Sequence, residues 1–366
     1  MMFIIVSVIV LLSVATGLII QQAKFGKLPS GKRLERIKKS PNYKNGAFQN
    51  QSYTPVLADD VSFYSVGKEF FFGKKKRVTP IDSIPSIKTD LLHLDKSKDV
   101  LVWFGHSSYF IQIDGKKILV DPVLSGSASP LSFTTKAFKG SDPYKADDIP
   151  EIDYLFITHD HWDHLDYDTI IKLKPKIKKV ICPLGLGENL EYWGYNPTII
   201  IEKDWNEKII LDSSFTAYTV PARHFSGRSF QRNKSLWTAF VLHTPTFKFY
   251  IGGDGGYDTH FAEIGKTFGE FDLAILENGQ YNDKWKYIHM KPEEVLQAAK
   301  DLKAKRLLPV HSSKFALALH PWNEPLKRIT AANKQINLPL LTPIIGEQVK
   351  LKDSIQFFPE WWEGIQ

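Results

Sequence analysis

Hydrophobic residues follow two patterns along this chain, with one long run at the N-terminus and many short runs after residue 100. Residues 3–20 form an uncharged, mostly apolar stretch of 18 residues, and a helix needs roughly 17–25 residues to cross a bilayer. The later runs are β-prone and are separated by turns such as Asp114-Gly115, a pattern typical of consecutive strands. We therefore expect an N-terminal helix that can span a membrane, followed by a domain of alternating strands and helices.

The strands predicted for this domain share short runs of β-branched, aromatic and other apolar residues. They cover residues 100–104, 109–113, 117–120, 154–157, 215–220, 236–242, 248–251, 273–276 and 306–310. Helices are predicted at 292–303, which has Pro292 in its first turn, and at 324–336. This pattern divides the chain into an anchor at 1–22, an irregular membrane-proximal arm at 23–90 and a folded domain at 91–366.

A cleaved signal peptide is the alternative to an anchor for residues 3–20. Such a peptide normally has a basic region before its apolar run and a small-x-small cleavage site after it. The first three residues carry no Lys or Arg, and the small-x-small site at 13–15 lies inside the run. These features favour an uncleaved anchor, and the sequence leaves open whether residues 1–22 are removed.

The charge of the chain is concentrated beside the predicted anchor. The chain has a formal net charge of +7; residues 23–77 hold 13 Lys or Arg against 4 Asp or Glu, and the remainder holds 34 against 36. A basic flank is normally kept on the cytoplasmic side of a membrane, so we expect a single-pass membrane protein whose domain is cytoplasmic. The seven basic residues at 24–39 can also bind anionic lipid headgroups. Because the rest of the chain is nearly charge-balanced, nucleic acid is not an expected partner.

The most informative polar residues follow the apolar run at 154–157. Within six residues the chain places His159, His161, Asp163 and His164. His159 and His161 are two apart in an extended loop, so their imidazoles point to the same side and can bind one cation. The adjacent Asp163 and His164 diverge and can serve a second cation. Imidazole with carboxylate suits zinc, and also manganese or iron; a solvated histidine-rich turn is the plain alternative.

Three later apolar runs each end in a further residue of a metal-binding type. These residues are His224, Asp254 and His311. Each alone could be an ordinary strand terminus. Several strands that each deliver one ligand to one edge of a sheet, however, form a rigid scaffold that positions a site. Together with the cluster at 159–164, the three residues complete two ligand sets.

The order of these residues resembles a known family. An H-x-H-x-D-H motif followed by His, Asp and His at strand ends is similar to the metallo-β-lactamase fold superfamily. Further segments resemble the branch that contains N-acylphosphatidylethanolamine-hydrolysing phospholipase D and its bacterial relatives, and they lie at 103–108, 118–122, 252–257 and 289–294. The resemblance covers residues 25–345 and implies an α/β fold, the four-layer αββα sandwich of this superfamily.

The resemblance also implies two zinc ions, with manganese or iron(II) as alternatives, and a role for each ligand. The first metal would bind His159, His161 and His224, the second would bind Asp163, His164 and His311, and Asp254 would bridge the pair.

A metal pair of this kind implies a mechanism of hydrolysis. Two cations about 3.5–4 Å apart can share a bridging water and lower its pKa enough to form hydroxide near neutral pH. That hydroxide is the expected nucleophile on phosphorus or a carbonyl carbon, with Asp163 orienting it. His289 and Tyr281 are candidates to contact the substrate or protonate the leaving group, with packing as the alternative. His106 and Asp121 are expected to make hydrogen bonds that support the ligands.

Three classes of function fit these features. The first is a membrane-anchored, zinc-dependent phosphodiesterase that acts on a membrane lipid or a small molecule. The second is a lactonase or amidase that uses the same metals, and the third is a catalytically silent binding protein, which the complete ligand set disfavours. Glu277 and Gln280 stand where the phospholipase has apolar residues, and this departure keeps the second class open.

Overall fold

Two mixed β-sheets face each other in the computed structural model, which describes residues 1–73 and 77–366. The strand order is β15-β3-β4-β5-β6-β7-β8 in the first sheet and β14-β13-β12-β11-β10-β9 in the second. The first sheet consists of β3 (Val100–Trp103), β4 (Tyr109–Ile113), β5 (Lys116–Val120), β6 (Ile152–Phe156), β7 (Ile177–Pro183), β8 (Ile200–Lys203) and β15 (Gln348–Lys350). The second consists of β9 (Lys208–Ile210), β10 (Thr216–Val220), β11 (Ala239–His243), β12 (Lys248–Ile251), β13 (Leu273–Glu277) and β14 (Leu307–Val310).

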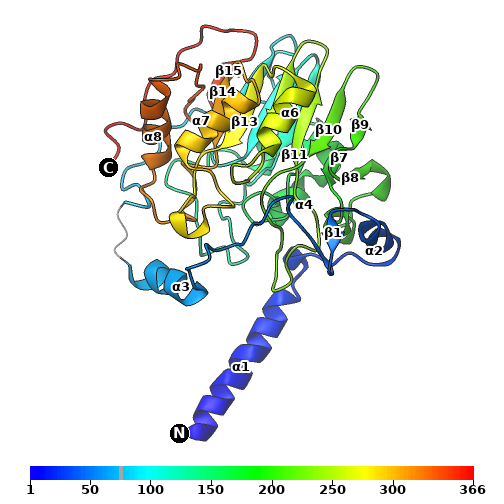
Figure 1. Ribbon diagram of the computed structural model, residues 1–366, viewed down its shortest axis with the longest axis vertical. Helices are drawn as coiled ribbons and strands as arrows, with labels where there is room; N and C mark the ends of the chain where they lie inside the picture. The colour runs from blue at the N-terminus through cyan, green and yellow to red at the C-terminus, as the bar shows by residue number, and fades with distance from the viewer. Residues whose placement is uncertain (74–76) are drawn as a thin grey trace.

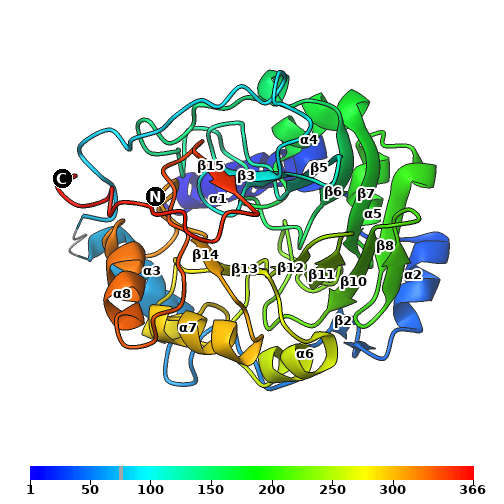
Figure 2. The same cartoon turned by 90° about the horizontal axis from the view of Figure 1, so that it is seen from above.

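Helices cover the outer face of each sheet (Figures 1 and 2). They are α4 (Tyr167–Leu173) and α5 (Gly187–Tyr192) on the first sheet, and α6 (His260–Phe268), α7 (Pro292–Asp301) and α8 (Glu324–Asn333) on the second. Leu173 and Leu190 share a buried cluster with strands of the first sheet, and Phe261 and Leu296 share another with strands of the second. The expected α/β fold with four αββα layers is therefore confirmed.

The residues of the central strands alternate between the two sides of their sheet. In β3, Leu101 and Trp103 point into the space between the sheets, whereas Val100 and Val102 point toward the outer helices. Successive side chains of a strand face opposite ways, so a strand that is apolar throughout is stable only where both faces are covered. The unbroken apolar runs after residue 100 thus account for helices on both sides of the sandwich.

All nine predicted strands occur, and their ends differ from the prediction by at most three residues. Both predicted helices also occur, and each ends two or three residues early. The sequence pattern does not predict β7, β8, β9 or β15. β9 and β15 have three residues each, of which one is buried, and β7 contains two consecutive lysines. Short edge strands carry too few apolar residues to produce a recognisable alternation.

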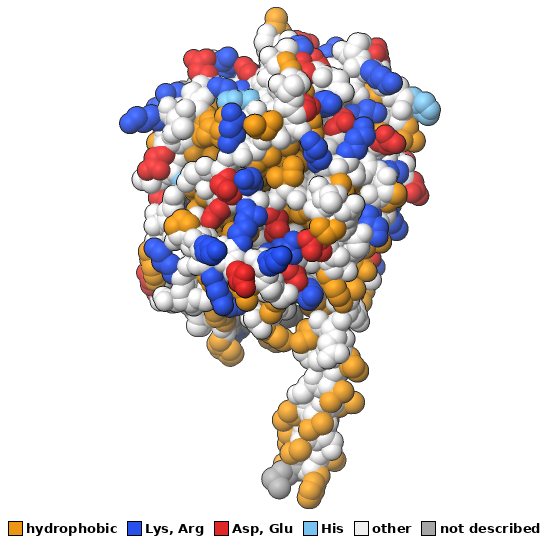
Figure 3. All heavy atoms as spheres, turned by 90° about the vertical axis from the view of Figure 1, so that its right-hand side faces the viewer, with side chains coloured by type: hydrophobic (Ala, Val, Ile, Leu, Met, Phe, Trp, Pro, Cys, Tyr) orange, Lys and Arg blue, Asp and Glu red, His pale blue; other side chains and the backbone are white. Residues whose placement is uncertain are grey.

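The N-terminal helix α1 (Met2–Ile20) projects from the domain as an isolated rod (Figures 1 and 3). Its window Phe3–Ile20 has a mean hydropathy of 2.9 and is 0% buried against the rest of the chain. In Figure 3 hydrophobic side chains cover the rod, while basic and acidic side chains intermingle over the domain. Length and composition allow α1 to cross a bilayer, and a signal sequence would have the same properties.

The arm after α1 is less irregular than the sequence predicts. It contains α2 (Gly31–Lys38), α3 (Phe63–Phe72) and a hairpin of β1 (Tyr43–Lys44) and β2 (Ala47–Phe48). Ile37 of α2 is 0% exposed within the cluster beneath the second sheet. Arg33 forms ion pairs of 2.5–2.7 Å with Glu188, Glu191 and Glu202. The arm therefore packs on the domain, and the division of the chain at residue 91 stays a prediction.

The segment just after α1 is fixed to the loop that follows β6. The ring of Phe25 meets the ring of Trp162 edge-on, with centroids 5.1 Å apart. The guanidinium of Arg228 lies 3.8 Å from the Trp162 centroid. It donates hydrogen bonds to the carbonyl of Lys24 at 2.8 and 3.1 Å, and to the carbonyls of residues 160 and 165 at 2.9 and 2.7 Å. The residues just after α1 are thus held against the loop that follows β6.

Short 3-10 turns complete the described elements. They are η1 (Ala23–Phe25), η2 (Ala146–Asp148), η3 (Lys174–Lys176), η4 (Pro197–Ile199) and η5 (Asp283–Trp285).

Candidate metal centre

The predicted metal ligands meet at one edge of the sandwich. The loop at 159–164 follows β6 of the first sheet, whereas His224, Asp254 and His311 follow β10, β12 and β14 of the second. Because β12, β13 and β14 are parallel neighbours, their carboxyl ends lie at the same edge, which brings Asp254 and His311 together. Each of the seven predicted ligands is buried or half-buried.

Three histidines form the first group. Nε2 of His159 lies 2.9 Å from Nδ1 of His161, and Nε2 of His224 lies 3.2 Å from the same nitrogen. The three nitrogens converge within 4.8 Å of one another, a spacing that allows one ion to contact them all. The structure thus brings together the residues that the sequence assigns to a first metal.

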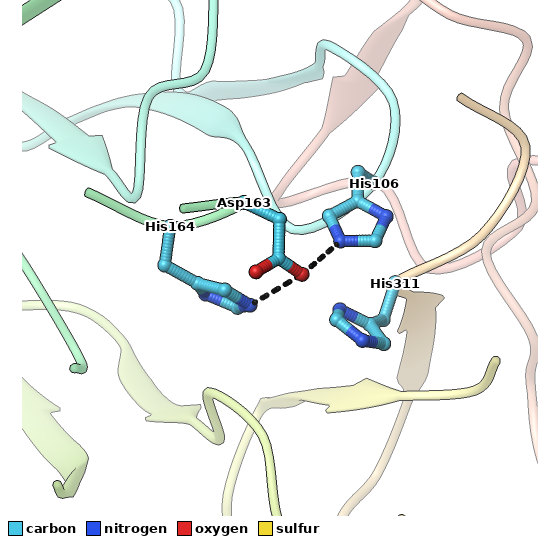
Figure 4. A group of neighbouring side chains, drawn as sticks. All are labelled: His106, Asp163, His164 and His311. Carbon is cyan, nitrogen blue, oxygen red and sulfur yellow. Dashed lines mark hydrogen bonds and ion pairs between the residues drawn. The ribbon is translucent and has the colours of Figure 1, made fainter. Parts of the chain in front are cut away.

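The second group contains Asp163, His164 and His311, and Figure 4 shows that His106 joins them. Oδ2 of Asp163 lies 3.6 Å from Nε2 of His164 and 2.8 Å from Nε2 of His106. His106 follows β3, so it approaches from the first sheet, as the loop of Asp163 does. The expected supporting role of His106 agrees with its hydrogen bond to Asp163, while its distance also qualifies it as a ligand.

Asp254 lies between the two groups. Its Oδ2 is 3.1 Å from Nε2 of His164 and 3.9 Å from Nε2 of both His159 and His224. Its Oδ1 is 3.1 Å from Nδ1 of His311. One carboxylate therefore faces ligands of both sets, which is the position that a bridging residue requires.

The pKa values of the histidines favour metal binding. Burial lowers the pKa of His161 to about 3. Burial, aided by repulsion from neighbouring imidazoles, lowers the pKa values of His159, His224 and His311 well below the ordinary range. Protons and metal ions compete for the same lone pair, so neutral imidazoles are ready ligands at neutral pH.

His164 and Asp254 show that the centre needs a positive charge. Burial would lower the pKa of His164, but the carboxylates of Asp254, Asp163 and Asp121 outweigh it and raise that pKa well above the ordinary range. Burial raises the pKa of Asp254 to about 6. Nε2 of His164 and Oδ1 of Asp254 are buried, and neither makes a hydrogen bond of good geometry within the described part of the chain. A cation would satisfy both atoms, so the residues present fit a metal centre.

Hydrogen bonds from residues outside the ligand sets hold the ligands in place. Asp121 contacts Nδ1 of His164 at 2.8 Å and accepts a hydrogen bond from the backbone N–H of Thr158 at 2.9 Å. Its carboxylate thus orients a predicted ligand, as the sequence suggests. The carbonyl of Ile288 lies 3.0 Å from Nδ1 of His224. Contacts of this kind fix ring orientation in metal sites.

Unusual backbone conformations gather at the same edge. His106, Asp121, Gln280 and His311 have φ values between 40° and 67°, a region that residues other than glycine rarely adopt. The precise direction of these side chains is therefore maintained at some conformational cost, which is typical of functional sites. Gly253, with a φ of 60°, lies so close to Thr158 that an added Cβ would stand 2.7 Å from its side chain.

His289 lies against the metal cluster and is held by Glu277. Nδ1 of His289 is 2.5 Å from Oε2 of Glu277, whose Oε1 accepts a hydrogen bond of 2.8 Å from the backbone N–H of Met290. The ring of His289 stacks on that of His311 at 5.2 Å. Burial raises the pKa of Glu277 well above its ordinary value and lowers that of His289. Burial thus disfavours the charged form of both side chains, and sequence analysis alone does not reveal the contact.

Gln280 and Tyr281 lie further from the predicted ligands. The Oε1 atom of Gln280 accepts hydrogen bonds of 2.9 Å from the backbone N–H groups of residues 317 and 318. The hydroxyl of Tyr281 donates to Glu324 at 2.9 Å, and its ring stacks on that of His320. The described residues that line the cavity include Gln280 but not Tyr281, so the structure places Tyr281 behind the cavity wall. A substrate contact for Tyr281 would need this hydrogen bond to break.

A cavity of about 340 Å³ opens above the cluster. Its floor carries the polar side chains His161, Asp163, His224, Asp254, His289 and His311, and its walls carry apolar ones, namely Val56, Leu57, Val66, Phe70, Phe225, Trp285, Ile288 and Leu317. Four of the wall residues belong to the N-terminal arm. Sequence patterns do not indicate where the arm lies, so this part of the site cannot be predicted from them.

The chain is similar to known proteins in sequence and in fold. The family model described as the beta-lactamase superfamily domain matches residues 116–312. An uncharacterized protein of Mycobacterium tuberculosis is 36% identical over 334 residues, which cover 88% of this chain and 87% of that protein. A metallo hydrolase of the archaeon Ignicoccus hospitalis has the same fold, with a TM-score of 0.53 and 20% identity over 69% of this chain and 98% of its own.

These matches identify the class of protein. The chain belongs to the metallo-β-lactamase superfamily, and it is a metal-dependent hydrolase. Within that class it is related to N-acyl-phosphatidylethanolamine-hydrolyzing phospholipase D 1 of Caenorhabditis elegans, which is 32% identical over 222 residues, or 57% of this chain and 62% of the worm enzyme.

Proposed function

We propose that this protein is a membrane-anchored, dinuclear zinc phosphodiesterase that acts on a phospholipid-like substrate. The observation that carries the proposal is the cavity, whose floor holds two metal-binding groups joined by Asp254 and whose walls are apolar. A charged phosphodiester suits the floor, and acyl chains suit the walls. Relationship to the worm phospholipase supports the same substrate class.

The metal pair would supply Lewis acidity and an activated water. The residues of the chain supply the rest. His106 fixes Oδ2 of Asp163 by a hydrogen bond, so this carboxylate keeps its orientation toward the reacting atoms. Glu277 engages Nδ1 of His289, which leaves Nε2 as the polar atom that a substrate can reach. With the shared hydrogen on Oε2 of Glu277, the neutral ring would carry its N–H at Nε2 and could donate that proton to the departing oxygen while Nδ1 takes up the proton of Glu277.

The anchor and its basic flank are part of the proposal. Helix α1 would hold the enzyme on the membrane, with the domain on the cytoplasmic face, because basic flanks are retained there. Lys32, Lys38 and Lys39 of the flank are exposed and would attract anionic headgroups. Arg33 contributes less to this attraction because three glutamates already engage it.

Elemental analysis and a substrate screen test the proposed reaction. The purified full chain, reconstituted with zinc or manganese, should bind close to two equivalents of metal. Phosphodiesters, lactones and amides are then compared at equal enzyme concentration, with the metal-free protein as control. Hydrolysis confined to phosphodiesters is expected. Preferential cleavage of a lactone or amide would replace the proposed substrate class, and a folded protein that never exceeds one equivalent would exclude the dinuclear centre.

A further inference from the structure

Helix α3 presents apolar side chains on two opposite sides. Val66 and Phe70, one turn apart, line the cavity above the metal cluster. Tyr64 and Phe72 are 80% and 84% exposed, and together with Lys68 they occupy positions i, i+4 and i+8, which lie on one face of a helix. Two outward aromatic rings with a lysine between them are typical of a helix that lies in a membrane interface.

The sequence around the end of α3 allows two interpretations. The sequence places Phe70–Phe72 beside a basic run at 74–77, which suggests a membrane-surface patch or core packing. In the structure these two residues have different environments: Phe70 lines the cavity, whereas Phe72 is exposed. Residues 74–76 of the basic run lie outside the described residues.

Phe230 adds an exposed apolar side chain near the anchor. It is 80% exposed, and it lines a groove with residues of α1 between Ile9 and Ile20. This part of α1 is uncharged and apolar enough to lie within a bilayer. A side chain that runs alongside it would lie at the same depth, so the position of Phe230 suits lipid better than water.

The anchor and α3 emerge at the same end of the molecule. Figure 1 shows α1 leaving the lower end of the domain and α3 lying at that end. The cavity that α3 borders is therefore next to the face that a membrane-spanning α1 would turn toward the bilayer.

We propose that the outward stripe of α3, formed by Tyr64, Lys68 and Phe72, enters the same bilayer as α1 and Phe230. The aromatic rings would lie at headgroup depth, and the amine of Lys68 would lie among lipid phosphates. The mouth of the cavity would then rest on the lipid surface, and substrate would enter without crossing water. This inference rests on the membrane anchor of the proposed function but not on its reaction.

Spin labels can measure the depth of each residue. Cys182 is the only cysteine of the chain and is buried, so a cysteine introduced at the surface carries the label. The full chain is labelled at Tyr64→Cys, Phe72→Cys or Phe230→Cys and reconstituted into vesicles of phosphatidylcholine and phosphatidylglycerol. Leu11→Cys in α1 provides the bilayer reference. Ile355→Cys provides the aqueous reference, because Ile355 is 89% exposed and follows β15, which Figure 1 shows at the end of the domain opposite α1.

Relaxation by oxygen, which enters lipid, is compared with relaxation by a water-soluble chromium oxalate. Labels at positions 64, 72 and 230 should respond more to oxygen, as the label at position 11 does. If labels at 64 and 72 respond like the label at 355, α3 faces water and the inference is overturned, whatever the label at 230 reports. This measurement needs no enzymatic activity, so it stands even if the proposed reaction proves wrong.

A kinetic comparison gives an independent test. The double variant Tyr64→Asp, Phe72→Asp should hydrolyse a phospholipid in vesicles at least about tenfold more slowly than wild type, since it loses its interfacial contact. It should hydrolyse a water-soluble phosphodiester, bis(p-nitrophenyl) phosphate, at the wild-type rate. The matched control, Ile355→Asp with Phe357→Asp, should leave both rates unchanged. Equal loss on both substrates would mean that the stripe supports the fold, and no loss on either would mean that it does not contact lipid; both results contradict the inference.

Discussion

Asp163 combines contact with the metal cluster and a hydrogen bond that fixes its orientation. Asp163→Asn keeps the shape of the side chain but removes the charge that faces His164. We expect the variant to stay folded and its kcat to fall by about 10²–10⁴, the typical value for a lost acid–base or orienting group. Circular dichroism, metal content and kcat are measured together. Asp168→Asn, a change at an exposed residue, is the control, and a fully active Asp163→Asn would contradict this role.

His289 is predicted to act on the substrate and not on the metals. His289→Ala should therefore keep both metal equivalents and lose kcat by about 10²–10⁴. Loss of a metal from this variant would make His289 a ligand. Full activity with both metals present would make it a structural residue.

Glu277 is predicted to act only through His289. Glu277→Gln retains volume and a hydrogen-bonding oxygen but removes the carboxylate 2.5 Å from Nδ1 of His289. We expect kcat to fall with little change in KM or metal content. In a His289→Ala background the same change should have almost no further effect on kcat, because the two residues act as one unit. An additive loss of kcat in the double variant would show that Glu277 has a separate role.

The sequence predicts the ligand positions better than their partners. The H-x-H-x-D-H motif is local, so its spacing alone predicts that His159 and His161 point to the same side. The pairing of His106 with Asp163 joins residues 57 apart, and that of Glu277 with His289 joins residues 12 apart across two elements. Such contacts depend on how strands and loops are arranged in space, which a pattern of residue types does not encode.

At the scale of elements, we expect α2 to be held on the domain by the half-buried Arg33. The side chain of Arg33 is 14% exposed, and those of its partners Glu188 and Glu202 are 8% and 9% exposed. Arg33→Ala would leave the buried carboxylate of Glu202 without its ion-pair partner, whereas Glu188 would keep Lys27 at 3.4 Å; loss of one partner of a buried pair costs about 3 kcal/mol. We expect the midpoint of thermal unfolding to fall by several degrees.

A surface ion pair is the control for this measurement. Lys178 is 58% exposed and pairs with Asp153 at 3.1 Å. Lys178→Ala should change the free energy of unfolding by less than about 1 kcal/mol. If Arg33→Ala is no more destabilising than this control, α2 is held by its apolar face instead.

The elements that the sequence predicts are those buried on both faces. β4 and β12 occur with the predicted bounds: every residue of β4 is buried, and so are the last three of the four residues of β12. α3 is not predicted, although it forms a wall of the cavity, because a helix of ten residues with a glycine in it has a weak pattern of its own. Its stability comes from contacts with distant parts of the chain.

For the whole molecule, the orientation in the membrane can be tested directly. The basic flank predicts that protease added outside intact spheroplasts leaves the domain undigested, because the domain lies on the cytoplasmic face. Permeabilised spheroplasts, in which the domain should be digested, serve as the control. Digestion in intact spheroplasts would reverse the predicted orientation, and a mature protein that begins near residue 16 or 22 would show that the anchor is cleaved.

The contacts of residues 23–27, which follow α1, also indicate where the chain can be truncated. Residues 23–27 stay on the domain even without the helix before them, since Ala23 accepts a hydrogen bond from the indole of Trp193 and Lys27 donates one to Asn189. A version that starts at residue 22 should thus dissolve without detergent and retain metal. A protein that starts at residue 30 would lack Phe25, whose ring contacts Trp162. It should bind metal less tightly, although it retains every predicted ligand.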